Sequence, residues 1–416
     1  MYCVIDAVGK MALIPKTKRQ PLMTAPTQKS YWLVPLFWLI FFTTMIMRGP
    51  HNVVGPMAQQ VCDFYGMTWA TYGILAGIPM ATFGIFSLVA PTLIRRFGPA
   101  VVFGAAVLGI VIGSGVRVMP QTLVLFAGTL LFSMSIANLN ILMPTLVKTG
   151  LTAHQKPVMG IYSALIGVSG LFGTASTGVV RSVFPDMTSP FLFWSGAALL
   201  CLVFLPVLFG FRLPDAPKTA QAGSTTGGSP IALLIGMMAF QATLTTCFAS
   251  YSAAYFVEAG FSKADGTVML NLFMGFMVFG SLIAGYIREP AKPLMLYGPL
   301  TLVYLAGIAG WGSVAGGFAG AAFSSALLGT LHGAVMAFAF IAVVRKTPSA
   351  AILKVSGYVQ FGGYFLAGIG PWLAGVLVQR TGFEVLPWLL SGFVLCWSAF
   401  ALLTARRPDR DAQGIR

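Results

Sequence analysis

The sequence predicts an all-α membrane protein with twelve transmembrane helices in two six-helix bundles. Hydrophobic residues make up 57% of the 416-residue chain and charged residues only 8%, too little charge for a soluble protein of this length. Apolar runs of about 20 residues, enough to cross the hydrocarbon core of a bilayer, recur along nearly the whole chain. The lipid bilayer is therefore the expected surrounding of the protein.

Residues 1–30 form the expected cytoplasmic N-terminal tail. This tail has no signal-peptide h-region followed by a small-residue cleavage site, so we expect the first helix to remain as an anchor. Residues 31–211 form the predicted N-terminal bundle. Its six spans are Trp32–Pro56, Trp69–Leu93, Ala100–Val118, Thr122–Val147, Met159–Val183 and Pro190–Phe211.

Residues 212–230 read RLPDAPKTAQAGSTTGGSP, a composition rich in Gly, Ser, Thr and Pro that is typical of a linker, here a cytoplasmic one. Residues 231–405 form the predicted C-terminal bundle, and residues 406–416 form a cytoplasmic tail. The six spans of this bundle are Ile231–Val257, Gly266–Ile287, Leu294–Ser313, Phe318–Val344, Leu353–Val378 and Val385–Ala405. Six spans on either side of a linker indicate two repeated halves.

The net charge of +15 comes mostly from Lys and Arg in alternate loops, which is the positive-inside pattern of membrane proteins and not a nucleic-acid site. Twenty of the 25 cations fall on the side that holds both termini. The opposite side holds Arg117, Arg181, Lys263 and Arg380. This split predicts an integral plasma-membrane protein, in a bacterium the inner membrane, with both termini in the cytoplasm.

The five cysteines are scattered and show neither a disulfide framework nor the spacing of metal ligands. The chain also lacks a P-loop, HExxH and GxSxG motifs and any pair of carboxylates at membrane depth. We therefore predict a protein that is not an enzyme and that uses no cofactor or metal.

Arg48 is the remaining cation, and it lies inside the first apolar span. A charged side chain at the centre of a membrane helix costs about 2.5–3.5 kcal/mol on insertion scales, so it normally faces a partner or a watery cavity. His51 and Asn52 share its helical face, since they follow at i+3 and i+4. Pro50 and Pro56 each leave a carbonyl of the preceding turn free. The favoured partner is a negative or electron-rich ligand, and the alternative is that Arg48 reaches the outer interface.

Six further polar residues at membrane depth complete the predicted substrate site: Asn140, Tyr162, Gln241, His332, Gln360 and Tyr364. The alternative for each is a hydrogen bond between helices, the commoner role of a buried polar side chain. All ten acidic residues fall in loops, tails or helix ends, so no embedded carboxylate can carry a proton. If protons are coupled, His51 or His332 would be the carrier. The alternative is two neutral histidines that hydrogen-bond across helices.

Five short motifs occur in order along the chain. The first is Arg48-Gly-Pro-His-Asn-Val-Val-Gly-Pro56, of the type R-P-x-x-x-x-V-G-P. The others are Ile78-Pro-Met-Ala-Thr-Phe-Gly84, Leu139-Asn-Ile-Leu-Met-Pro-Thr-Leu-Val-Lys148, Gly160-Ile-Tyr-Ser163 and Gly363-Tyr-Phe-Leu-Ala-Gly-Ile-Gly-Pro371. Together they resemble the cyanate permease and 2-nitroimidazole transporter group of the major facilitator superfamily, over roughly residues 31–406.

The chain departs from that pattern at several positions. The loop Leu93-Ile-Arg-Arg-Phe-Gly98 lacks the usual Asp, and Leu139 stands where a Gly precedes Asn140. The seventh span keeps Gln241 but carries Thr246, Tyr251 and Ala253 in place of Tyr, Trp and Pro. The tenth has His332 where related chains often carry Gln. A substrate other than cyanate therefore stays open.

The resemblance implies secondary active transport of a small solute by alternating access. The lack of embedded acids beside Arg48 favours a small anion or a polar, electron-rich compound, and the resemblance implies cyanate-like anions or nitroimidazole-like compounds. Arg48 would bind the charge, while Asn52, Asn140 and Gln241 would donate or accept hydrogen bonds. The alternatives are a drug or organic-solute exporter of the same superfamily, a membrane-embedded enzyme and a passive channel. We expect a monomer.

Overall fold

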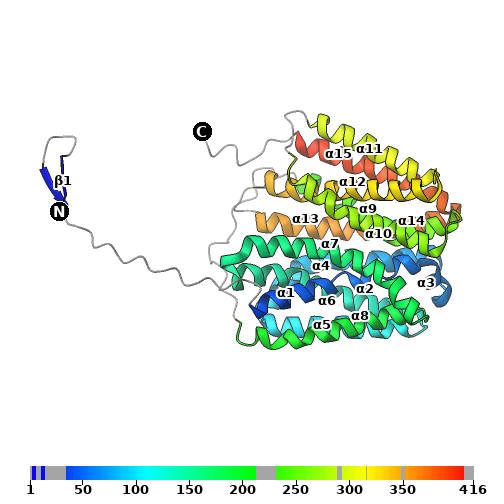
Figure 1. The fold of residues 1–416 in the computed structure, drawn as a ribbon, viewed down its shortest axis with the longest axis horizontal. Coiled ribbons are helices and arrows are strands. Elements are labelled where there is room, and N and C mark those ends of the chain that lie inside the picture. The colour runs from blue at the N-terminus through cyan, green and yellow to red at the C-terminus, as the bar shows by residue number, and fades with distance from the viewer. Residues whose placement is uncertain are drawn as a thin grey trace.

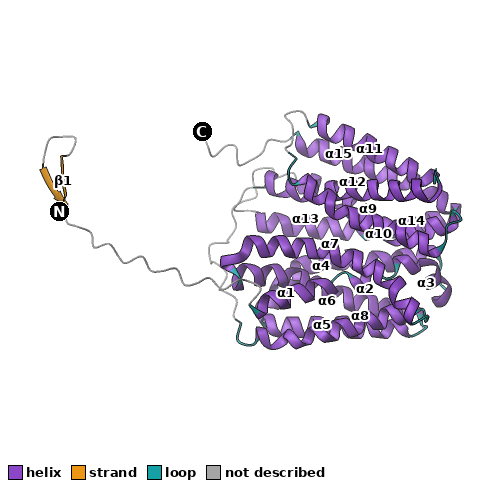
Figure 2. Ribbon diagram, in the orientation of Figure 1, coloured by secondary structure: helices purple, strands orange, loops and turns teal. Residues whose placement is uncertain are grey.

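The computed structural model describes residues 2–5, 11–14, 34–211, 231–287, 293–314, 316–347 and 352–406. This part of the chain is almost entirely helical (Figure 2), and its helices run alongside one another in a bundle (Figure 1). Within it, eleven helices are long and apolar enough to cross a membrane by length and composition. The predicted twelfth, which is the first in the chain, is broken into short pieces. A short hairpin that the all-α prediction did not include pairs β1 (Tyr2–Ile5) with β2 (Met11–Ile14).

The elements of the N-terminal half follow the predicted spans to within a few residues, apart from the first. They are α1 (Pro35–Ile46), α2 (Gly49–Asn52), η2 (Gly55–Met57), α3 (Ala58–Tyr65), α4 (Trp69–Phe97), α5 (Pro99–Gly115), η3 (Val116–Val118), α6 (Thr122–Gly150), η4 (Thr152–His154), α7 (Gln155–Val183), α8 (Ser189–Leu200) and η5 (Cys201–Leu208). The start of α4 at Trp69 is fixed by Thr68, whose hydroxyl accepts a hydrogen bond from the Thr71 amide at 3.3 Å.

The C-terminal half repeats this alternation of long helices. Its elements are α9 (Ile231–Glu258), α10 (Lys263–Ala284), α11 (Leu294–Ser313), α12 (Gly317–Lys346), α13 (Ile352–Ala367), α14 (Ile369–Thr381), η7 (Phe383–Val385) and α15 (Leu386–Ala405). A capping box between Ser262 and Asp265 begins α10. The predicted linker, residues 212–230, lies outside the described residues, so the domain boundaries stay predictions.

The first predicted span, Trp32–Pro56, differs most from the structure. Helix α1 stops at Ile46, and short helical pieces then continue to Tyr65, nine residues past the predicted end. Pro50 and Pro56 cause the interruptions, because a proline has no N–H to donate to the preceding turn. Gly66, with a φ of 61°, ends the last piece in the left-handed conformation that glycine favours.

The two halves pack against each other along α4 with α13 and α14, and along α7 with α10. We call the end of the bundle that carries Arg95, Lys148 and Lys346 the cation-rich end, and the other the cation-poor end (left and right in Figure 1). At the cation-poor end the Tyr72 hydroxyl donates to the Ser250 carbonyl at 2.9 Å, across the halves. Hence the halves are closed against each other there.

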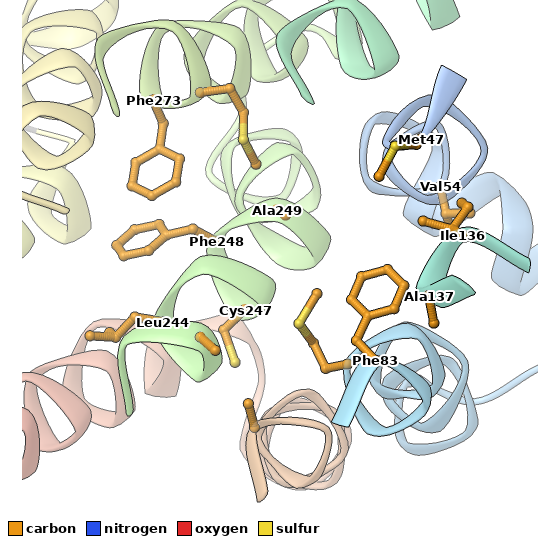
Figure 3. Packing of buried hydrophobic residues seen from close by; sticks show 14 of the residues in the cluster. Met47, Val54, Phe83, Ile136, Ala137, Leu244, Cys247, Phe248, Ala249 and Phe273 are labelled. Carbon is orange, nitrogen blue, oxygen red and sulfur yellow. The ribbon is translucent and has the colours of Figure 1, made fainter. Parts of the chain in front are cut away.

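Close backbone contact makes this closure tight. A Cβ atom added to Gly77 of α4 would lie 2.1 Å from the carbonyl oxygen of Gly368, at the break between α13 and α14. Only a residue without a side chain allows two helices to approach so closely. Buried apolar side chains of both halves fill the space around the crossing, among them Phe83 of α4 and Cys247 of α9 (Figure 3).

Candidate functional site

The break in the first helix places Arg48 between α1 and α2, where backbone groups lose their helical partners. Ser169 of α7 replaces these partners, since its Oγ accepts from the Arg48 amide at 3.1 Å and donates to the Met45 carbonyl at 2.8 Å. Irregular backbone at membrane depth is tolerated where neighbouring helices satisfy it in this way. The backbone that carries the Arg48 side chain is thereby tied to α7.

The Arg48 guanidinium is half-buried and makes no hydrogen bond or ion pair with the residues that the structure describes. Its Cζ lies 5.2 Å from the centre of the Phe83 ring of α4, a cation–π contact. Its electrostatic neighbours are the phenol groups of Tyr162 of α7 and Tyr364 of α13. We call these four residues the Arg48 cluster. It joins both halves, since α13 belongs to the C-terminal one.

The predicted site residues lie at similar depths. Counting 1.5 Å per residue from the helix ends at the cation-rich end puts Arg48, Tyr162 and Tyr364 roughly 10–20 Å into the bundle. The hydrocarbon core of a bilayer is about 30 Å thick, so Arg48 and Tyr364 are near its middle and Tyr162 is nearer the cation-rich end. An unpaired cation flanked by phenol groups at that depth has the chemistry to hold an anion or a polar, electron-rich molecule.

Three amides from the predicted site retain hydrogen-bonding capacity. Asn140 of α6 and Gln360 of α13 are half-buried, and neither side chain hydrogen-bonds to any described residue. Gln241 of α9 is 2% exposed, and its Nε2 lies 3.0 Å from Met238 Sδ, a weak acceptor. Their contact with a substrate stays a prediction.

Arg48 and the two residues predicted to share its face make different contacts in the structure. The helical spacing holds, because the backbone N–H of Asn52 donates to the Arg48 carbonyl at 3.0 Å. However, Asn52 Nδ2 donates to the Gly170 carbonyl at 3.0 Å and thus ties the broken helix to α7. His51 and Asn52 both line a small cavity that Arg48 does not reach, and His51 interacts electrostatically with Arg48 and Arg117.

His332 lies in the core of the C-terminal half and is 0% exposed. Its Nε2 is 2.6 Å from Thr245 Oγ1 of α9, and its Nδ1 is 2.9 Å from the Tyr304 hydroxyl of α11. Both ring nitrogens are therefore occupied, and in this conformation none is free for a ligand. This geometry supports the hydrogen-bonding alternative for His332.

Arg117 is the residue that the sequence argument misplaced. Counted among the cations of the loops, it is instead 0% exposed and lies in η3, the short helix that follows α5 directly. The predicted third span, Ala100–Val118, already contained Arg117, and this was the signal in the sequence that could have placed it inside the membrane.

A further polar contact that was not predicted joins the halves. Thr174 Oγ1 of α7 donates to Asn271 Oδ1 of α10 at 2.5 Å.

Two packed halves, built from apolar helices that are long enough to cross a membrane, define an integral membrane protein. The family model described as Major Facilitator Superfamily matches residues 36–298. The chain therefore belongs to the Major Facilitator Superfamily. Since this is a family of transporters, the prediction that the protein is not an enzyme is confirmed.

Known proteins agree with this membership. The chain is 27% identical over 378 residues to the 2-nitroimidazole transporter of Escherichia coli (strain K12), covering 86% of this chain and 93% of the relative. It is 24% identical over 375 residues to the cyanate transport protein CynX of the same organism, covering 86% and 94%. A bacterial homologue of the human lysosomal transporter Spinster, solved in an inward-facing and occupied conformation, has the same fold. Its TM-score is 0.70 at 14% identity, and the match covers 90% of this chain and 96% of that one.

Proposed function

We propose that the protein is a secondary active transporter that works by alternating access and carries a small anion or a small polar, electron-rich compound. Cyanate-like anions and nitroimidazole-like compounds are the substrate classes. The observation that carries the proposal is the Arg48 guanidinium, which lies at mid-depth and has no hydrogen bond or ion pair within the described ranges. The printed functions of the two relatives, 2-nitroimidazole and cyanate transport, support the same classes.

A substrate bound at the Arg48 cluster would touch both halves. Arg48, Phe83 and Tyr162 come from the N-terminal half, and Tyr364 comes from the C-terminal half. A negative group beside the guanidinium offsets the cost of the buried cation, while a phenol O–H can donate to the same group. A ligand that contacts both halves is able to bias how they close, as alternating access requires.

The remaining residues of the predicted site have different roles in this proposal, some as substrate contacts and others in holding the helices. Asn140, Gln241 and Gln360 supply hydrogen bonds to the substrate. His51 and Asn52 hold the broken first helix beside the site, and His332 fixes the helices of the C-terminal half. The protein acts as a monomer in the plasma membrane, in a bacterium the inner membrane, with both termini in the cytoplasm and with protons as a possible coupling ion.

The test compares Arg48→Gln with Arg48→Lys in proteoliposomes, by uptake of radiolabelled cyanate and of 2-nitroimidazole. Loss of one charge from a buried contact costs about 2–5 kcal/mol, so we expect kcat/KM for the anion to fall about 100-fold in Arg48→Gln. Arg48→Lys keeps the charge and should retain part of the activity.

Arg181→Gln is the matched control, because it also removes an arginine from the N-terminal half, one whose guanidinium donates to Gln60. It should transport normally. Uptake at the wild-type rate in Arg48→Gln would exclude Arg48 as the substrate contact.

A further inference from the structure

The small cavity that His51 and Asn52 line lies away from the Arg48 cluster, toward the cation-poor end. Its volume is about 20 Å³, and its lining includes His51, Arg117 and Thr129 of the N-terminal half and Ser250 of α9. A cavity of this size has room for one water molecule or one monatomic ion.

Arg117 is the charged group of this cavity, and most of its donors have no acceptor. Its Nη1 donates to the Pro50 carbonyl at 2.8 Å. Its Nε and Nη2 are buried and have no hydrogen-bond partner in the described part of the chain. A guanidinium has five N–H donors, so the single bond to Pro50 leaves it largely unsatisfied.

Two aromatic rings hold the guanidinium in place. Its Cζ lies 4.1 Å from the ring centre of Phe191 and 5.0 Å from that of Phe132. Ring faces attract a desolvated cation but do not neutralise it. No carboxylate of residues 34–211, 231–287, 293–314, 316–347 or 352–406 forms an ion pair with Arg117. The positive charge is thus buried without a counter-charge, an arrangement that is unfavourable at low dielectric.

Thr129 adds a second unpartnered polar group to the same cavity. Its Oγ1 is buried and has no hydrogen-bond partner among the described residues. A hydroxyl that can turn its proton toward the cavity is a suitable donor to a small anion. His51 also lines the cavity and interacts electrostatically with the guanidiniums of Arg48 and Arg117.

We propose that this cavity binds one small monovalent anion of the size of chloride, with Arg117 as its counter-charge and the Thr129 hydroxyl as a hydrogen-bond donor. A water molecule could accept from the free N–H groups, but it would leave the charge uncompensated. The site is distinct from the Arg48 cluster and does not depend on the proposed transport function.

The position of the site gives the anion a further role. Ala249 and Ser250 of α9 close the cavity from the C-terminal half, and the Tyr72 hydroxyl bonds to the Ser250 carbonyl beside it. The site is complete only while the halves are closed at the cation-poor end. A bound anion therefore stabilises this closed arrangement.

The test measures the melting temperature Tm of the purified full-length protein in sodium chloride, sodium bromide and sodium gluconate at equal ionic strength. We expect chloride and bromide to raise Tm with saturation, and gluconate, which is too large for the cavity, to have no such effect. Thr129→Val removes one hydrogen-bond donor at nearly constant volume, so its half-saturating chloride concentration should rise about tenfold.

Two controls separate this site from the others. Arg181→Gln removes a different guanidinium near the same end, and Arg48→Gln removes the one of the proposed substrate site. Both should keep the chloride effect. Crystals grown in bromide should show an anomalous peak in the cavity. A wild-type Tm that is the same in all three salts, an unchanged chloride response in Thr129→Val, or a cavity that holds only water would each overturn the proposal.

Discussion

Arg48 and Arg117 are two guanidinium groups inside the same apolar half, and their surroundings differ. Arg48 is half-buried and lies over the Phe83 ring, in the Arg48 cluster that both halves share. Arg117 is 0% exposed and is enclosed by Phe132 and Phe191. A partly accessible cation can exchange its ligand in each transport cycle, whereas an enclosed one keeps a ligand until the halves separate. The first suits a substrate and the second a structural ion.

His332 offers a test of what a buried histidine does here. His332→Phe keeps the ring volume but removes the bonds to Thr245 and Tyr304. Interhelical hydrogen bonds in membranes average about 0.6 kcal/mol each, so we expect unfolding to become easier by about 1–2 kcal/mol. A lower Tm in detergent, with KM for the substrate unchanged, is the expected result.

Ser163→Ala is the control for that substitution, since the Ser163 hydroxyl is exposed and bonds only within its own helix, to the Met159 carbonyl. Its Tm should match the wild type. A changed KM with a normal Tm in His332→Phe would instead return His332 to the wall of the substrate pocket, where the sequence prediction placed it.

Part of the site was accessible from sequence, because a charge in an apolar run is visible without a structure. Arg48 was found in this way, and Tyr162 and Tyr364, two other residues of the predicted site, are its electrostatic neighbours. Their contact with a substrate stays a prediction. Arg117 was missed because it stands one residue before the end of a predicted span, where a cation normally reaches the interface. Whether a cation near the end of a span is buried depends on the direction of its side chain, and the periodicity of apolar residues does not give that direction.

At the scale of single helices, the close crossing of α4 with α13 is the feature on which closure depends. Gly77→Val would place a Cβ 2.1 Å from the Gly368 carbonyl oxygen, far inside van der Waals contact. The two helices must then separate, so we expect the closed cation-poor end to be destabilised and the transport rate to fall at least about tenfold. Uptake into proteoliposomes measures this, with the amount of inserted protein as the reference.

Gly178→Val provides the matched control within the same half. A Cβ at Gly178 of α7 meets no atom within 4 Å, although the change in side chain is identical. Transport by this variant should stay near the wild-type rate. An equal loss of activity in both variants would point to the helix propensity of valine and not to the crossing.

Helix positions were predicted well where apolar runs are uninterrupted. Helix α4 begins at the predicted Trp69, and α11 has the predicted bounds Leu294–Ser313. The first span was wrong at its end, because Pro50 and Pro56 break it and short helical pieces then continue to Tyr65. Helix α7 contacts these pieces at Asn52 and at Gln60. Hydrophobic length marks where a helix enters the membrane, but tertiary contacts decide how a broken one continues.

The whole molecule is closed at its cation-poor end, and alternating access requires this end to open. Ala70 of α4 and Gln379 of α14 meet there across the halves, the Ala70 amide donating to Gln379 Oε1 at 3.3 Å. In a background without the exposed Cys396, the double variant Ala70→Cys/Gln379→Cys can be joined by a short bis-methanethiosulfonate reagent. We expect cross-linking to abolish transport in proteoliposomes and dithiothreitol to restore it.

The single variants Ala70→Cys and Gln379→Cys control for modification alone, and each should keep its transport rate after the same treatment. If the cross-linked double variant still transported at full rate, the cation-poor end would not open during the cycle. The solute would then cross through a path that needs no separation of the halves, as in a passive channel, and its flux would rise linearly with concentration. Saturable uptake that stops on cross-linking and returns on reduction requires both halves to move about the Arg48 cluster.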